Sequence, residues 1–123
     1  MTESLKTVVL GASKKPERYS HKALVMLRDH GHDVIPVHPQ FDEIENIPVV
    51  ASLGEIQEEI DTVTVYLSPS ISSKLAAELI DLRPRRVIFN PGAENPELQA
   101  QLEQAGILVE EACTLVLLTT DQY

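Results

Sequence analysis

The chain has 123 residues and a mass of 13.6 kDa, which is the size of one domain. Its formal charge of −9 and its lack of Trp argue against nucleic-acid binding, because such proteins usually present a basic face or a platform of aromatic rings. The single cysteine, Cys113, excludes an internal disulfide and a Cys-rich zinc site, and it favours a reducing cytoplasm. The absence of a long apolar run argues against a membrane span and against a secretion signal.

The first third of the chain predicts two strands around one helix. The run 7–10 is apolar and β-branched, which is typical of a strand buried on both faces. Residues 20–30 have the apolar spacing of a helix, and Gly31 is a natural stop. The run 33–37 predicts a second strand, in which Pro36 indicates an edge position or a position late in the strand.

The middle of the chain is less regular and then returns to the same alternation. Residues 39–52 predict a loop with an extended piece at 49–50. We expect a short helix over 52–60, a strand over 62–67 and a helix over 71–82, whose apolar residues fall on one stripe.

The last third continues the pattern. A strand is predicted over 86–89, and Asn95 followed by Pro96 is typical of a helix N-terminus. Gly106 ends this helix, and 107–109 is the last clear strand.

This alternation predicts an α/β fold: a Rossmann-like parallel sheet with helices on both faces, in a single domain over 1–123. Ligands of such sheets bind at the carboxyl ends of the strands. The residues that directly follow each strand are therefore the candidates for a binding site.

The turn after the first strand is the strongest candidate, as a site for phosphate groups. Gly11 permits a tight turn and close backbone approach, Ser13 offers a hydroxyl, and Ser20 is placed to cap the following helix, whose N-terminus favours anions. The same stretch carries the cations Lys14, Lys15 and Arg18. We expect the main-chain amides of this turn to hold a diphosphate, with a solvated turn as the alternative.

Two known nucleotide motifs are missing from this turn. Ser13 and Pro16 stand where a dinucleotide fingerprint has its second and third glycines, and no phosphate-loop motif ending in Gly-Lys-Ser/Thr is present. The second strand is followed by no acid before Asp42, which disfavours NAD, although the cations suit a phosphorylated ribose such as that of NADP.

Four segments in order along the chain carry a resemblance to a known family. They are V-V-L-G-A-S-K-K-P-E-R-Y-S-H through V-I-P-V-H-P at 8–39, V-Y-L-S-P at 65–69, F-N-P-G-A-E-N at 89–95, and G-I-L-V-E-E-A-C at 106–113. Together they resemble the small single-domain CoA-binding proteins, which are similar to the CoA-binding domain of the succinyl-CoA synthetase alpha subunit.

The resemblance implies a Rossmann-like domain that binds CoA or an acyl-CoA through its ADP part. Phosphates would lie near Gly11, Ala12, Ser13, Lys15 and Arg18; adenosine near Val37, His38 and Pro39; an opposite wall would be Leu67, Ser68 and Pro69; and pantetheine would pass Asn90 and Gly92. The phosphorylated histidine of the synthetase lies in a different domain, so the resemblance implies ligand binding without ligase activity.

Three functions remain open at this point. A non-catalytic CoA-binding or regulatory module is favoured over an enzyme. An oxidoreductase or redox sensor that uses an NADP-type dinucleotide is the alternative. A regulatory partner with a degenerated site is the third, because His38 and Gln40 depart from the family's usual residues. The open edges of a small sheet are compatible with a homodimer.

Several chemistry-bearing residues are better explained by structure than by catalysis. His30 and His32 lie where a helix should end, which explains them without a metal. Cys113 lacks a neighbouring base and is expected to be a buried structural residue. Arg85 and Arg86 precede a strand at its amino end and are expected to be solvated.

Three further residues have two interpretations each. His38 could stack or hydrogen-bond at the ligand, and Glu94 could be a general base or simply an acid that favours a helix start. His21 falls in the first helical turn, where a neutral ring is expected.

Overall fold

The computed structural model describes residues 4–123 and has a five-stranded parallel sheet at its centre. The strands are β1 (Thr7–Leu10), β2 (Val34–Val37), β5 (Thr62–Val65), β6 (Arg86–Phe89) and β7 (Leu108–Glu111). Their order in the sheet is β2-β1-β5-β6-β7, and all four pairings are parallel. A small antiparallel hairpin, β3 (Glu43–Ile44) and β4 (Ile47–Pro48), lies beside the β2 edge.

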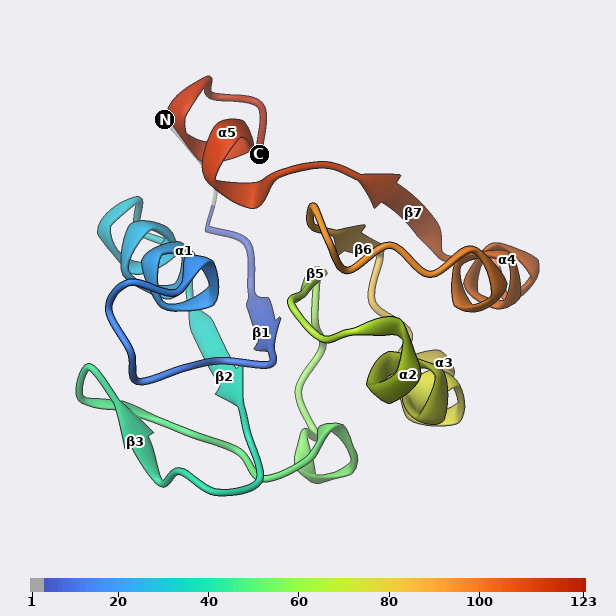
Figure 1. Cartoon of the computed structure of the whole chain (residues 1–123), viewed down its shortest axis with the longest axis horizontal. Coiled ribbons are helices and arrows are strands. Elements are labelled where there is room, and N and C mark those ends of the chain that lie inside the picture. The colour runs from blue at the N-terminus through green and yellow to red at the C-terminus, as the bar shows by residue number, and fades with distance from the viewer. Residues whose placement is uncertain (1–3) are drawn as a thin grey trace.

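Helices cover both faces of the sheet, as Figure 1 shows. The helices are α1 (Tyr19–Asp29), α2 (Pro69–Ser72), α3 (Ala76–Leu82), α4 (Pro96–Gln104) and α5 (Thr114–Thr119). The α1 and α5 helices lie on one face, and α2, α3 and α4 lie on the other (Figure 1). The prediction of a Rossmann-like α/β domain is therefore confirmed.

Successive residues of the central strands supply two separate apolar cores. Val8 and Leu10 pack with Phe89 on the α3 and α4 side, whereas Val9 packs with Leu27 on the α1 side. All four residues of β1, β5 and β6 are buried. This double burial explains why these strands lack the alternation of polar and apolar residues that a one-sided sheet would show.

The chain changes direction in the sheet between β1 and β5. From β1 it passes through α1 to β2 on one side, and from β5 it passes through α2 and α3 to β6 on the other. Such a switch point leaves a crevice at the carboxyl ends of the two strands, where ligands of doubly wound sheets bind. The turn at Gly11 and the residues after β5 border this crevice.

The proline in β2 is explained by its edge position, as predicted. Among residues 4–123, β2 has β1 on one side and, on the other, only a single parallel bridge between Val37 and Val50. The Val50 amide donates to the Pro36 carbonyl at 2.9 Å, so Pro36 turns its backbone away from β1 and its missing N–H deprives no acceptor of β1.

Some predicted element boundaries are wrong. The helix expected over 52–60 is only a 3-10 turn at Leu53–Glu55, because Ile56 already has an extended backbone with φ −83° and ψ 123°. The helix expected over 71–82 begins at Pro69 and is interrupted by a 3-10 turn at Ser73–Leu75. Helix α5 was not predicted. Among residues 4–123, no helix combines the length and apolar character needed to cross a bilayer.

The expectation that Arg86 is solvated is also wrong. Arg86 is only 5 % exposed, whereas the neighbouring Arg85 side chain is 55 % exposed. The Arg86 Nε donates to Thr62 Oγ1 at 3.1 Å, and its guanidinium lies 4.6 Å from the centre of the Tyr123 ring. The C-terminal residue therefore covers an arginine that begins a central strand.

Candidate functional site

Two cavities meet above the carboxyl ends of β1, β2 and β5. One has a volume of about 310 Å³ and a mostly apolar lining, and the other has a volume of about 390 Å³ and contains the cations of the loop after β1. Gly11, His38 and Leu67 line both of them. The sequence predicted a site at this edge, and the structure has these two cavities there.

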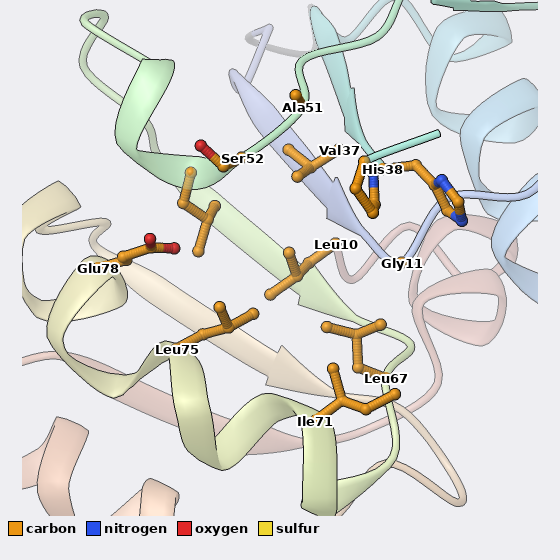
Figure 2. A pocket seen from close by; sticks show the side chains of 12 residues that line it. Leu10, Gly11, Val37, His38, Ala51, Ser52, Leu67, Ile71, Leu75 and Glu78 are labelled. Atoms are coloured by element: carbon orange, nitrogen blue, oxygen red, sulfur yellow. The ribbon is translucent and has the colours of Figure 1, made fainter. Parts of the chain in front are cut away.

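The apolar cavity lies between β2 and α2. Figure 2 shows Val37 and His38 on one side and Leu67 and Ile71 on the other, with Leu10 at the base. Its remaining lining is Pro39, Ala51, Ser52, Leu53, Leu75 and Glu78, besides Gly11. A cavity of this size with few polar groups fits a flat heteroaromatic ring.

The second cavity is cationic. Lys15 and Arg18 line it from the loop, and Tyr19 and Ser20 line it from the first turn of α1. Ala12, Ser13, Phe41 and Tyr66 complete the lining, with Gly11, His38 and Leu67. Both basic side chains are exposed and free to move toward an anion.

Gly11 keeps the two cavities open. Its φ of +90° lies in the region that favours glycine, and a Cβ there would come within 2.8 Å of Leu67 Cδ2 and 3.3 Å of the Tyr66 carbonyl carbon. Any larger residue would therefore push against the segment after β5 and narrow the junction between the cavities.

The expectation that the main-chain amides of the turn after β1 hold a diphosphate is wrong for Gly11 and Ala12. The amides of Gly11 and Ala12 both donate to the Val37 carbonyl at 3.3 Å, so they continue the β1–β2 pairing and do not face a ligand. The Ser13 hydroxyl is likewise engaged, since it accepts from the Lys15 amide at 3.1 Å.

The free amides lie instead at the start of α1. The N-cap of α1 is Arg18, which gives no side-chain hydrogen bond, so the expectation that Ser20 caps the helix is wrong. Ser20 is one residue inside the helix and is 6 % exposed. Within residues 4–123, the amides of Tyr19, Ser20 and His21 have no acceptor. An uncapped helix N-terminus beside two cations is suited to a phosphate group.

His38 is oriented by its neighbours. Its Nδ1 accepts a hydrogen bond from the Gln40 amide at 3.0 Å, which leaves the proton of the neutral ring on Nε2. The ring stacks on Phe41 with centroids 4.2 Å apart, and Lys14 Nζ lies 5.0 Å from the Phe41 ring centre. Lys14 therefore lies over the Phe41 ring, whereas Lys15 lines the cationic cavity.

A third cavity continues from the cationic one. It has a volume of about 240 Å³ and is lined by Tyr19, Tyr66, Asn90, Pro91 and Cys113, of which the two tyrosines also line the cationic cavity. Burial raises the pKa of Tyr66, and its hydroxyl has no hydrogen-bond partner within residues 4–123. Cys113 is half-buried here, so the expectation that it is buried is wrong, and its structural role stays a prediction.

Asn90 borders the third cavity but its amide already has partners. Its Nδ2 donates to Thr64 Oγ1 at 2.6 Å and to the Val65 carbonyl at 3.0 Å, and its Oδ1 accepts from the Thr114 amide at 2.9 Å. These bonds join β5, β6 and the start of α5. Its contact with pantetheine stays a prediction, and the structure adds this bridging role.

Three other residues from the sequence prediction lie outside the lining of these cavities. Ser68 and Pro69 form the start of α2, where the Ser68 and Ser70 hydroxyls are 3.1 Å apart. Gly92 follows β6, and its amide donates to Glu94 Oε1 at 2.9 Å, which is a local structural role for that acid. Their ligand contacts stay predictions.

Sequence reasoning missed part of the lining. Tyr66, Phe41 and Ile71 follow or face the predicted strands, but no motif marks them as binding residues. Ile71 is 50 % exposed and Tyr19 is 67 % exposed, which is unusual for large apolar side chains. Such exposure is visible only in the folded chain.

The two histidines at the end of α1 have separate partners. The His30 Nδ1 lies 2.8 Å from the Met26 carbonyl, while the His32 Nδ1 accepts from the Leu5 amide at 3.0 Å. Burial lowers the pKa of His32. In the described part of the chain, no three potential metal ligands come together.

Comparison with known proteins places this chain in a family. The sequence pattern of the CoA-binding domain family matches residues 6–119. The uncharacterized protein YneT of Bacillus subtilis (strain 168) is 30 % identical over 106 residues, which are 86 % of this chain and 78 % of that protein.

Solved structures share the same architecture. The crystal structure of an uncharacterized protein has a TM-score of 0.94 and 36 % identity, over 99 % of this chain and 100 % of that chain. The dinucleotide-forming acetyl-coenzyme A synthetase 1 of Ca. Korarchaeum cryptofilum, in complex with phosphate and ADP, has a TM-score of 0.75 and 18 % identity. That match covers 87 % of this chain but 25 % of the synthetase, and it shows a shared fold.

Proposed function

This chain belongs to the CoA-binding domain family, and from that premise we propose that it binds CoA or an acyl-CoA as a non-catalytic binding or regulatory module. The family match favours CoA over an NADP-type dinucleotide. The adenine would occupy the apolar cavity, the diphosphate the cationic cavity, and the pantetheine arm would extend toward the third cavity.

One observation supports this proposal above all: an apolar and a cationic cavity share Gly11, His38 and Leu67 at the switch point of the sheet. A ligand that fills both must join an apolar ring to an anionic group over a short distance, as the ADP part of CoA does. The uncapped amides of α1, with Lys15 and Arg18, supply the positive end.

Isothermal titration tests the assignment. We expect CoA and acetyl-CoA to release heat and to compete for one site, and NADP to compete poorly. Absence of heat and of any thermal shift with either CoA compound at millimolar concentration would reject the proposal. Hydrolysis of the acetyl-CoA thioester should be no faster with the protein than without it.

Two adjacent lysines provide a matched pair of variants. Lys15→Gln removes a cation from the cavity and should weaken CoA binding about tenfold, which corresponds to ~1.4 kcal/mol. Lys14→Gln removes the same charge from a side chain that lies over Phe41, so its effect should be clearly smaller. Equal losses in the two variants would indicate a diffuse charge effect rather than a built site.

A further inference from the structure

His21 links the phosphate loop to a distant turn through its two ring nitrogens. It lies in the first turn of α1, and its side chain is 8 % exposed. Its Nδ1 is 2.8 Å from the Ser13 carbonyl oxygen. A carbonyl oxygen only accepts, so Nδ1 must carry a proton and donate it.

The other ring nitrogen faces an acid. Nε2 is 3.5 Å from Glu45 Oε2, which belongs to the turn between β3 and β4. Because the neutral ring has its single proton on Nδ1, it presents the Nε2 lone pair to a carboxylate. A second proton on Nε2 replaces this unfavourable contact by an ion pair.

Charges of both signs surround this ring. The hairpin contributes Glu45, and the Arg28 guanidinium from α1 also approaches it, with Nη1 3.9 Å from Glu45 Oε1. The ring also lines a groove with Lys22 and Asp29 of α1 and with His30, which follows the helix, and Arg18 of the loop precedes it. The positive end of α1 and these cations oppose a charged ring, whereas Glu45 and Asp29 favour it. Histidine is the side chain whose charge changes most readily between about pH 5 and pH 8.

We propose that His21 is a positioning residue for the anion site, with the charge of its ring coupled to the shape of the phosphate loop. The Nδ1 proton holds the Ser13 carbonyl and so fixes the peptide plane between Ser13 and Lys14, beside the cationic cavity. The proton on Nε2 ties that arrangement to Glu45 and stabilises it. This inference rests on the proposed function and adds a pH dependence to it.

Dephospho-CoA is the appropriate probe, because its diphosphate has no group that titrates between about pH 5.5 and pH 8.5. We expect wild-type protein to bind it about threefold to tenfold more tightly near pH 6 than near pH 8.5. Glu45→Gln removes the acid and should flatten this profile. His30→Asn removes an exposed histidine of the same helix and should leave the profile as in wild type. His38 is unchanged in all these variants, so the differences between their profiles arise from the substituted residues.

Two substitutions of His21 separate positioning from general stability. His21→Asn keeps a donor near the place of Nδ1 and should bind like wild type at high pH but without the pH dependence. His21→Ala loses the donor and should bind more weakly at every pH. A pH profile that is unchanged in both Glu45→Gln and His21→Asn would overturn the inference.

A ligand-free measurement distinguishes this inference from the proposed function. In ¹⁵N-labelled protein without ligand, the amide signals of Ser13 and Lys14 should shift with pH along the titration of the His21 ring, and Glu45→Gln should change that titration. If these shifts occur while CoA compounds give no binding heat, the coupling stands and the proposed ligand fails. If the amide signals of Ser13 and Lys14 do not change with pH together with those of the His21 ring, the coupling is rejected, whether or not CoA compounds bind.

Discussion

Gly11 is the residue whose replacement most directly changes the site. Gly11→Ala combines a positive φ with a contact of 2.8 Å to Leu67, so we expect it to lower the free energy of unfolding by roughly 1–3 kcal/mol and to weaken CoA binding. Gly31→Ala is the matched control, since Gly31 has a φ of +85° but nothing within 4 Å of the place that a Cβ would take. It should cost about 1 kcal/mol in urea unfolding and leave binding unchanged. Equal effects would contradict the steric part of the argument.

Asp61 provides a pH-dependent test at the same scale. Partial burial opposes ionisation, but hydrogen bonds from Arg85 at 2.8 and 3.1 Å and from Thr62 prevail and lower the pKa of Asp61. A lowered pKa stabilises the fold above the unfolded-state value of about 3.9, and this stability is lost as pH falls through the folded-state value. Because Arg85 is largely exposed, Asp61→Asn should cost about 1 kcal/mol or less at neutral pH. The difference from wild type in chemical unfolding should disappear at strongly acidic pH; a constant difference would assign the cost to packing.

Single residues also show where sequence reasoning stops. Gly11 and the cavity cations were identified from the sequence, because a glycine after a buried strand and clustered charges are local signals. The use of the Gly11 and Ala12 amides was predicted wrongly, since it depends on the Val37 carbonyl of a strand far along the chain. Arg86 was misplaced for the same reason: its cover, Tyr123, is the last residue of the chain.

Helices and strands could be predicted where the spacing of apolar residues and the capping residues indicate the same element. The five sheet strands, α1 and the Asn95 cap of α4 all follow from such local patterns, and the Asn95 side chain does accept from the Leu98 amide. The same side chain donates to Ser72 and Ser73 at 3.0 and 2.8 Å, where α2 gives way to the 3-10 turn. That interruption depends on a contact across the fold, which no local pattern contains.

Helix α5 was missed because its sequence, T-L-V-L-L-T, is too short for a helical spacing of apolar residues to stand out, and half of it is β-branched. Its start is fixed by Asn90, which accepts from the Thr114 amide at 2.9 Å. Asn90→Ala leaves the Thr114 amide without its acceptor and removes one of the partners of Thr64 Oγ1 and of the Val65 carbonyl, so we expect a loss of roughly 2–4 kcal/mol.

Hydrogen exchange locates the effect of this substitution. In Asn90→Ala the amides of α5 should lose protection more than those of α1 or α4. Asn95→Ala is the control: it removes the cap of α4 and the donor to Ser72 and Ser73, should also cost roughly 2–4 kcal/mol, and should leave α5 protected. Uniform loss of protection in Asn90→Ala would mean that the hydrogen bonds of Asn90 do not stabilise α5 more than the rest of the fold.

The whole molecule is acidic, with a formal charge of −9, yet its candidate ligand is a polyanion. Local cations at the cavity must therefore outweigh a repulsive net charge, which is possible because interactions beyond a screening length of about 8 Å are weak in physiological salt. We expect CoA affinity to fall as NaCl rises, and the slope against log salt to be smaller in Lys15→Gln. An affinity that rises with salt would show that the net charge dominates and that the loop cations contribute little.

The central claim is that the diphosphate of CoA lies at the uncapped first turn of α1. The most direct test is the change in ¹⁵N amide shifts when CoA is added to the labelled protein. We expect the amides of Tyr19, Ser20 and His21 to move downfield as they gain an acceptor, while those of Gly11 and Ala12, already bonded to Val37, move little. First-turn signals that stay in place while CoA binds would contradict it.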